Sequence, residues 1–297
     1  MAEHTQARPP ERDGGAPGEA AGAAGAAAAA AVESGADAAG GAAPDGSGAA
    51  VRGADAPGGA FAGVRVTPGA AAPPGLPAGA RVWAFDAGPG AEPDLSALDD
   101  AERRRHASFL RRADRIRYGV AHAALRRLLG EMTGTAPAAL RFGRRACPRC
   151  GGPHGRPVLE RPAGGPEFSL SHGGELVLVA VAPGRVGVDV EPVRAVPPEP
   201  SLVERLHPAE RAVVLTAPEA LRSAAFTRLW TRKEAYLKGL GVGLGRALDA
   251  DDVSTAVPGW HLVDLVPGNG HAGALAVESA GVVDTVGEIR ERGAALP

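Results

Sequence analysis

The stretch FTRLWTRKEAYLKGLGVGL, residues 226–244, fixes the position of a long helix and of the polar residues on it. Apolar residues at helical spacing supply its buried side: Phe226, Leu229, Leu237 and Leu240. Trp230, Glu234 and Lys238 follow at intervals of four residues and share a second face. Glycines from Gly239 onward end the pattern, which predicts a helix over residues 218–240. Taken alone, Glu234 and Lys238 also suit an ordinary i, i+4 ion pair worth about 0.2 to 0.5 kcal/mol.

A carboxylate pair precedes this helix in GVDVEPVR, residues 187–194. Because successive side chains of a strand alternate between its two faces, Asp189 and Glu191 share one face while Val188 and Val190 enter the core. Two carboxylates on one face repel each other unless a cation lies between them. Oxygen ligands of this kind suit Mg²⁺, whose remaining positions take water and substrate phosphates. The alternative is a polar strand face paired with arginines.

Strands and helices come in two similar runs along the chain. The alternation of apolar and polar residues predicts strands at residues 81–85, 139–142, 156–159, 167–171, 176–181, 186–191, 252–255, 260–266 and 272–278. Helical spacing predicts helices at residues 96–130, with Gly130 at the end, 201–215 and 218–240. The pattern indicates an α+β fold of two similar subdomains, each a small antiparallel sheet packed on a long helix.

The first quarter of the chain has a different composition. Residues 1–79 are rich in Ala, Gly and Pro and carry few large apolar side chains, so we expect a disordered tail there. The expected organisation is a first subdomain over residues 80–185, a second over 186–285, and a short tail over 286–297. Acidic residues among the alanines argue against a secretory signal, and no window approaches the apolar length of a membrane span. These features favour a cytoplasmic protein without a membrane partner.

An arginine-rich block lies between residues 101 and 130 of a chain whose formal net charge is −2. Such a block is typical of a solvated helix face. The alternative is a patch that binds phosphate groups or nucleic acid. A nucleic-acid-binding protein is therefore the alternative from another functional class, and it would interleave aromatic residues for stacking. Aromatic residues make up only 4% of the chain, and Phe109 and Tyr118 are the candidates in this block. No nucleic-acid partner is expected.

The carboxylate segment and the helix together resemble the two signature motifs of the Sfp-type 4'-phosphopantetheinyl transferases, in GVDVE, residues 187–191, and WTRKEAYLKGLGVGL, residues 230–244. Further segments are similar to other blocks of that family: FSLSHGGELVLVAVA, residues 168–182, to its Ser-His segment; HGRPVL, residues 154–159, to its Gly-Lys-Pro segment with Arg for Lys; and residues 114–130 and 270–277 to weaker blocks. The resemblance covers about residues 81–280.

This resemblance implies a pseudo-dimer of two α+β subdomains with coenzyme A in the cleft between them. It implies that Asp189, Glu191 and Glu234 hold Mg²⁺, and that Asp189, Glu234 and Lys238 are catalytic. The implied contacts to coenzyme A are Arg105, Arg156, Ser171, His172, Lys233 and Lys238. Lys238 would lie near the pyrophosphate, and Ser171, His172 and Arg156 near the 3'-phosphate.

The implied activity is transfer of the 4'-phosphopantetheine arm of coenzyme A to a serine of an acyl or peptidyl carrier protein, with release of 3',5'-ADP. Such a reaction serves polyketide, nonribosomal peptide or fatty acid synthesis. Glu234, directly or through a metal-bound water, would accept the serine proton, and Lys238 would stabilise the departing phosphate. Two runs of strand and helix in one chain favour the broad-range, monomeric kind. A catalytically dead relative is disfavoured because the acidic and lysine residues are all present.

One residue departs from the family pattern, and one cluster of residues allows a different interpretation. Gly173 stands where the family commonly has a second Ser, which removes a hydroxyl from the phosphate environment. Cys147, Cys150 and His154 have the spacing of zinc ligands, but a closed structural site needs a fourth ligand and the sequence offers no second cysteine pair. A tight turn with two free thiols in a reduced compartment is the simpler interpretation.

Overall fold

The computed structural model describes residues 64–65, 75–196, 198–268 and 270–279. Its two halves repeat one topology. The first half contains β2 (Arg81–Asp86), α3 (Arg112–Thr133), β5 (Glu167–Gly173) and β6 (Leu176–Ala182). The second contains β7 (Val186–Pro192), α6 (Glu219–Leu240), β8 (Trp260–Gly268) and β9 (His271–Glu278). In each half the last strand lies between the other two, in the orders β2-β6-β5 and β7-β9-β8, with antiparallel neighbours. The predicted α+β fold of two similar subdomains is confirmed.

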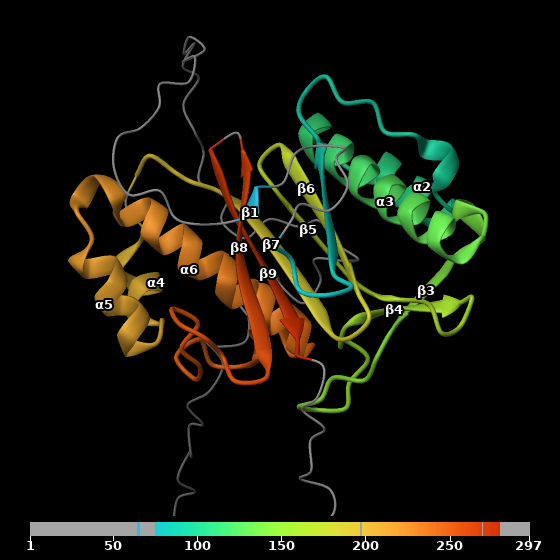
Figure 1. Cartoon of the computed structure of the whole chain (residues 1–297). Helices are drawn as coiled ribbons and strands as arrows, with labels where there is room; N and C mark the ends of the chain where they lie inside the picture. The colour runs from blue at the N-terminus through green and yellow to red at the C-terminus, as the bar shows by residue number, and fades with distance from the viewer. Residues whose placement is uncertain (1–63, 66–74, 197, 269, 280–297) are drawn as a thin grey trace, which may run out of the picture.

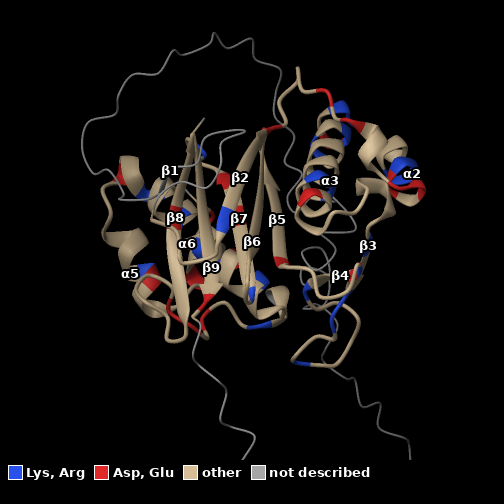
Figure 2. Cartoon of the chain, turned by 45° about the vertical axis from the view of Figure 1, so that its right-hand side comes forward, with Lys and Arg blue, Asp and Glu red and all other residues tan. Residues whose placement is uncertain are grey.

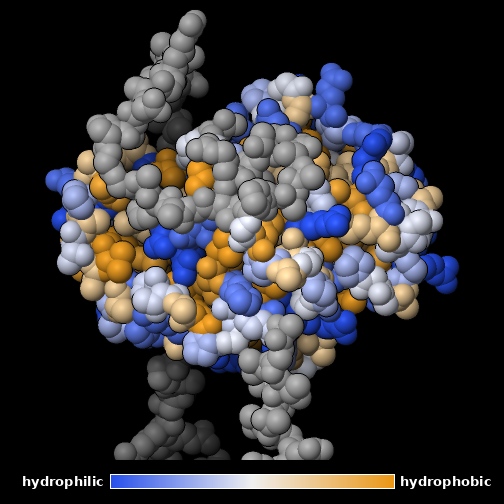
Figure 3. All heavy atoms as spheres, in the orientation of Figure 1, coloured by the Kyte–Doolittle hydropathy of each residue, from blue (hydrophilic) through white to orange (hydrophobic). Residues whose placement is uncertain are grey.

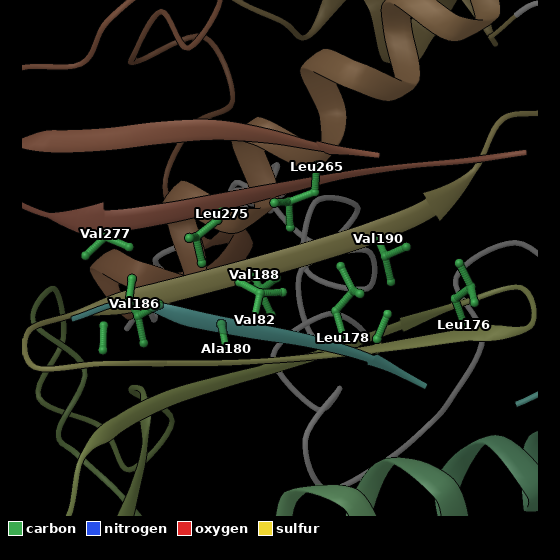
Figure 4. Close-up of a cluster of buried hydrophobic side chains, with 13 residues drawn as sticks. Val82, Leu176, Leu178, Ala180, Val186, Val188, Val190, Leu265, Leu275 and Val277 are labelled. Carbon is green, nitrogen blue, oxygen red and sulfur yellow. The ribbon is translucent and has the colours of Figure 1, made fainter. Parts of the chain in front are cut away.

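The two sheets pack against each other through an apolar layer, shown in Figure 4. Alternate residues of β6 and β7 meet there, among them Leu178 and Val188, both fully buried. β6 is apolar throughout because its other face packs on α3. Full burial of one such side chain contributes about 1.5 to 3 kcal/mol. The core between the sheets therefore joins the two halves into one body.

One long helix covers the outer face of each sheet (Figure 1). α3 packs Ala121, Leu125 and Leu129 against β5 and β6. α6 packs Ala235 and Leu237 against β9. The arrangement places α3 and α6 on opposite sides of the paired sheets, with β5 and β7 as neighbouring strands between them.

The short elements complete the described chain. A separate hairpin is formed by β3 (Arg141–Arg144) and β4 (Pro157–Arg161). Single 3-10 turns are η1 (Leu95–Ala97), η2 (Pro137–Ala139) and η3 (Gly243–Gly245), and the shorter helices are α2 (Asp100–Ser108), α4 (Pro200–Glu204) and α5 (Pro208–Thr216). The face in Figure 3 intersperses apolar and hydrophilic residues over the part that is described.

Within the expected N-terminal tail, Val64–Arg65 form the strand β1, which pairs in parallel with β8. Composition did not predict this strand because the edge of a sheet offers unpaired backbone groups that need no large side chain as a partner. The other residues of the expected tail up to residue 74, and the tail from residue 286, lie outside the described residues.

The predicted single helix over residues 96–130 is wrong in two respects. Asp99 and Glu102 form a capping box that begins α2, and Phe109 then leaves the helical conformation before α3 begins. The turn between the helices lets the ring of Phe109 contact that of Tyr118, with centroids 5.1 Å apart. Gly130 does not end α3, because the helix runs to Thr133 and stops at Gly134, where φ is +65°.

Two further predictions are corrected in the second half. The helix expected over residues 201–215 is split into α4 and α5, since His207 precedes Pro208 and so favours an extended conformation. Residues 252–255 form no strand. Instead Val253 is held by side chains, with its N–H donating to Glu210 and its carbonyl accepting from Arg232.

One arginine of the basic block is buried rather than solvated. Arg126 on α3 is 1% exposed and pairs with Asp99, at 2.6 Å, and with Glu102. It also donates to the carbonyl of Pro137. The charged positions of α2 and α3 are coloured in Figure 2. Five other arginines of the block are exposed, namely Arg103, Arg104, Arg111, Arg112 and Arg127, whereas Arg105, Arg115 and Arg117 are partly buried. The expectation of a solvated face therefore holds for only part of the block.

Candidate active site

β7 presents its two carboxylates to α6. Val188 and Val190 enter the core between the sheets, so Asp189 and Glu191, which alternate with them, face the other way. The alternation in the sequence predicts this arrangement. Asp189 is 3% exposed and Glu191 is half-buried.

Glycines at the crossing let α6 lie directly on β7. A Cβ atom at Gly187 would come within 3.0 Å of the Ala235 carbonyl oxygen and of the Gly239 backbone nitrogen, closer than real Cβ atoms approach. A larger residue at position 187 therefore requires the helix to shift. The close approach brings Lys238 of the helix over Asp189 of the strand.

Lys238 is the centre of a polar cluster at this crossing. Its Nζ donates to Asp189 Oδ1 at 2.6 Å and to Ser171 Oγ at 3.0 Å. The Ser171 hydroxyl in turn donates to Asp189 Oδ1 at 2.8 Å. β5, β7 and α6 thus each contribute one side chain, and Ser171 links the first half of the chain to the second.

The cluster carries more acidic than basic groups. Burial and the neighbouring charge of Asp189 raise the pKa of Glu191 and that of Glu234 from 4.5 to about 7. Burial lowers the pKa of Lys238, but Asp189 and Glu234 outweigh it and the net pKa is raised. One lysine therefore faces three carboxylates, a balance that favours an additional cation.

A second observation supports a cation here. Asp189 Oδ2 is buried and has no hydrogen-bond partner, although its Oδ1 has two. The donor set of carboxylate oxygens fits Mg²⁺. Asp189, Glu191 and Glu234 do not form a tight group, because in the described part of the chain only Cys147, Cys150 and His154 bring three such ligand atoms within 4.8 Å of one another.

Arg156 lies near Lys238, where α6 ends. Both line a small pocket of about 80 Å³, together with Arg144 and His154. Arg156 forms an ion pair with Glu167. A Cβ atom at Gly241, whose φ is +77°, would come within 3.0 Å of the Arg156 side chain, so the end of α6 packs against this arginine. The structure therefore brings Arg156 and Lys238 to one pocket.

Arg105 lines a larger, adjoining pocket of about 660 Å³ with Arg144, Arg141 and His122. The guanidinium of Arg105 stacks on Phe109, 4.9 Å from its centroid. Arg105 Nε and Arg144 Nη2 are both buried without a hydrogen-bond partner. Unpaired buried donors are costly, so this pocket suits an anionic ligand.

Ser171 and His172 point to opposite faces of β5. Ser171 contacts Asp189, whereas His172 lies on the side of α3, where Arg117 donates to the Gly174 carbonyl at 3.0 Å. Burial, and next the charge of Arg117, lower the pKa of His172 to about 4. His172 is therefore neutral near pH 7, and the structure does not bring it to Ser171's side of the sheet.

Lys233 lies apart from the other predicted ligands. Its side chain is 2% exposed, and Nζ donates to Glu210 Oε1 at 2.6 Å and to the Asp251 carbonyl. Glu210 itself is fully buried and also accepts from Val253 N–H. The lysine thus joins α6 to α5 and to the loop that contains Asp251. The structure does not place Lys233 at either pocket.

The packing of β5 on β7 explains why position 173 is a glycine. A Cβ atom at this position would come within 3.0 Å of the Val190 carbonyl oxygen, so β5 and β7 are closer here than a serine allows. The missing hydroxyl is compatible with tighter packing of the two strands.

Arg144 and Arg117 are the residues that the sequence did not single out. Arg144 lines both pockets, but the predicted strand 139–142 ends before it. The observed strand β3 runs to Arg144, and alternation from Phe142 would have placed the arginine on the same face. Arg117 gave no signal beyond the arginine block, because its contact with Gly174 is between distant segments.

None of the described helices combines the length and the apolar character of a membrane-spanning segment.

Comparisons with known proteins agree with the resemblance seen in the sequence. The family model "4'-phosphopantetheinyl transferase superfamily" matches residues 185–265, which contain β7 and α6. The chain is 32% identical over 201 residues to 4'-phosphopantetheinyl transferase HetI of Nostoc, a match over 63% of this chain and 82% of that protein. It is 26% identical over 183 residues to a Bacillus subtilis 4'-phosphopantetheinyl transferase, over 61% of this chain and 77% of the relative.

A third relative matches a shorter part. It is 4'-phosphopantetheinyl transferase psf-1 of Bacillus pumilus, 35% identical over 98 residues, which are 33% of this chain and 41% of the relative. The match to the Nostoc protein extends over most of that relative's length. The chain therefore belongs to the 4'-phosphopantetheinyl transferase superfamily and is a transferase.

Proposed function

We propose that the chain transfers the 4'-phosphopantetheine group of coenzyme A to a serine of acyl or peptidyl carrier protein domains. The observation that carries this proposal is the contact of Lys238 with Asp189 and Ser171, through which three segments of the family motifs meet. Polyketide, nonribosomal peptide or fatty acid synthesis would use the modified carriers. The names of the relatives support transfer of phosphopantetheine.

In the proposed reaction the serine oxygen attacks the β-phosphorus of coenzyme A and forms a phosphodiester. The bond from that phosphorus to the oxygen of 3',5'-ADP breaks, and the serine proton leaves to a base. Glu234 is the proposed acceptor, because a pKa of about 7 suits a group that takes up a proton near neutral pH. The alternative acceptor is a water that Glu234 orients.

Asp189, Glu191 and Glu234 are the residues proposed to hold Mg²⁺, and the buried, unpartnered Asp189 Oδ2 supports this. When bound, the ion would neutralise charge on the pyrophosphate oxygens. Lys238 is the proposed partner of the departing phosphate. Its side chain is 27% exposed and lines the small pocket.

For coenzyme A, we propose contacts from the residues that line the two pockets. Arg156 and Lys238 line the smaller pocket, Arg105 the larger one, and Arg144 both. Ser171 is proposed to act beside Lys238, and His172 as a neutral hydrogen-bonding group near Arg117. Lys233 remains a proposed ligand only from the family resemblance, since its ammonium is buried against Glu210.

We further propose that the chain acts as a monomer in the cytoplasm, and the repeated topology supports the first part of this proposal. Both halves of the pseudo-dimer are present in one chain and share a core, so a second copy is not needed to form the crossing of β7 and α6. The division into subdomains at residues 185 and 186 is proposed on the same ground.

A panel of apo carrier domains tests the proposed function. Purified protein is incubated with coenzyme A, Mg²⁺ and each carrier, and intact mass is recorded. At least one carrier should gain the mass of one phosphopantetheine, and the matching carrier with its serine changed to alanine should gain none. A mass gain in the serine-free carrier would contradict the proposal. The absence of a mass gain in every carrier would contradict it as well.

A further inference from the structure

The loop between β3 and β4 gathers two cysteines and a histidine outside the site described above. Cys147 is buried, whereas Cys150 and His154 are exposed. Cys150 Sγ lies 3.0 Å from His154 Nε2, and the three ligand atoms all lie within 4.8 Å of one another. The sequence alone left a turn with free thiols as the simpler interpretation, but the folded loop directs all three groups to one point.

The limits of these separations, 3.0 and 4.8 Å, lie on either side of those in a tetrahedral metal centre. Zn–S bonds of about 2.3 Å and Zn–N bonds of about 2.0 to 2.1 Å place tetrahedral ligand atoms roughly 3.5 to 3.8 Å apart. Two thiolates and one imidazole are soft or borderline ligands, which select Zn²⁺ over Mg²⁺. The acidic cluster around Asp189 has only oxygen ligands, so the two sites select different ions.

The backbone of the loop is folded around the three groups. Cys147 N–H donates to the Gly152 carbonyl and Gly151 N–H to the Cys147 carbonyl, each at 2.8 Å. Gly151 has a φ of +73°, which favours glycine. A Cβ atom at Gly155 would come within 3.0 Å of the Arg145 carbonyl oxygen, so glycine is required for this close approach. The backbone of the loop therefore positions the three ligands.

The ends of the loop carry two residues of the pockets. Arg145 N–H donates to the Arg156 carbonyl at 2.9 Å, and Arg144 Nη1 donates to the Gly155 carbonyl at 3.1 Å. His154 itself lines the small pocket beside Arg156. An ion bound at the tip of the loop would therefore hold the backbone that presents Arg144 and Arg156.

We propose that Cys147, Cys150 and His154 bind one Zn²⁺ ion, with water as the fourth ligand, and that this ion fixes the β3–β4 loop. The ion would hold the loop that presents Arg144 and Arg156, and it would take no part in the chemical step of the proposed phosphopantetheine transfer. The protein needs no other component to bind the ion, since all three protein ligands come from one loop.

The test uses the full chain, stripped of metal by a chelator and kept reduced. Zn²⁺ is titrated in competition with a chromophoric chelator, and Co²⁺ is used as a spectroscopic substitute. One Zn²⁺ should bind per chain, and Co²⁺ should give a thiolate-to-cobalt charge-transfer band with the visible bands of a tetrahedral ion. Hydrogen exchange at the amides of residues 147–155 should slow when Zn²⁺ is added.

Cys150→Ser and His154→Gln each remove one exposed ligand and should lower Zn²⁺ affinity by about tenfold or more, since even outer-shell partners change affinity by about 10 to 100-fold. His261→Gln changes an exposed histidine on β8 and is the matched control, which should bind like the wild type. Absence of the cobalt charge-transfer band, or unchanged Zn²⁺ affinity in Cys150→Ser, would overturn the proposal. Because no readout is activity, such a failure would leave the proposed transfer untouched.

Discussion

At the scale of single residues, the charges around Lys238 determine how the site responds to pH. Glu191 and Glu234 have pKa values raised to about 7 by burial and by Asp189. Both folded-state values exceed the unfolded one, so the folded chain holds these protons more tightly. Their contribution to stability is complete below about pH 4.5 and is lost as the pH rises through about 7.

Without Mg²⁺, the free energy of unfolding of the wild type should therefore fall by roughly 1 to 3 kcal/mol between about pH 5 and pH 8, relative to a Glu191→Gln/Glu234→Gln double variant. The pKa of His172 is lowered to about 4, so this residue makes the free energy of unfolding rise with pH. Its effect is the same in both proteins and cancels in the comparison. Urea unfolding in a metal chelator measures the difference. Parallel pH profiles for the two proteins would show that the two carboxylates are not perturbed. Added Mg²⁺ should restore the wild type at the higher pH.

Arg156 gives a second prediction at this scale. A charge-assisted hydrogen bond contributes about 1.5 to 3 kcal/mol, so Arg156→Ala should raise the KM for coenzyme A by roughly tenfold or more. Dephospho-coenzyme A, which lacks the 3'-phosphate, should show little change. Michaelis constants for both cofactors are compared in the wild type, in Arg156→Ala, and in Arg161→Ala, an exposed arginine on β4. Equal losses for both cofactors would mean that Arg156 acts on the structure or on the pyrophosphate.

At the scale of elements, the crossing of α6 over β7 assembles the site. Gly187→Ala inserts a methyl group where the Ala235 carbonyl lies, and overpacking of this kind costs about 1 to 3 kcal/mol. The variant should lose stability and also transfer activity, because Lys238 would move away from Asp189. Gly245→Ala is the control, since nothing lies within 4 Å of its added Cβ. Thermal unfolding and the transfer rate are measured together, and a fully stable, active Gly187→Ala would refute the close-contact account.

The elements also show what the sequence could predict. Alternation along residues 186–191 and the spacing from Trp230 to Lys238 predict β7 and α6 correctly, because both patterns are local. The break between α2 and α3 lets Phe109 contact Tyr118, and the helical spacing of the sequence did not indicate this break. The same holds for β1, whose partner β8 lies at the far end of the chain.

The same distinction between local patterns and contacts of distant segments applies to the residues of the candidate site. Asp189, Glu234 and Lys238 were identified because they lie in two recognisable motifs. The position of Lys233 depends on Glu210, a buried acidic partner on a different helix, so spacing could not show that the lysine is buried. Arg144, which lines both pockets, was missed because the predicted strand ended two residues before it.

At the scale of the whole molecule, the folded body is complete in its two halves. Removal of residues 1–74 deletes β1, which contributes two residue pairs at the edge of its sheet. The shortened chain should keep its transfer rate within about twofold and lose no more than about 3 kcal/mol of stability, as expected for one or two hydrogen bonds. Urea unfolding and the transfer assay check this. A chain that precipitates or loses most of its turnover would show that the N-terminal segment docks on the body.

The central claim is that Asp189 of β7 and Glu234 of α6 belong to one metal-dependent transfer centre. The most direct test is the transfer rate at saturating coenzyme A and Mg²⁺, read by intact mass of the carrier, in wild type, Asp189→Ala, Glu234→Gln and Glu204→Gln. Glu204 is exposed on α4 and serves as the control. Loss of a general base costs about 10² to 10⁴-fold, so we predict at least a hundredfold loss for the two site variants, with native circular dichroism and an unchanged control. Wild-type transfer by either site variant would contradict the account.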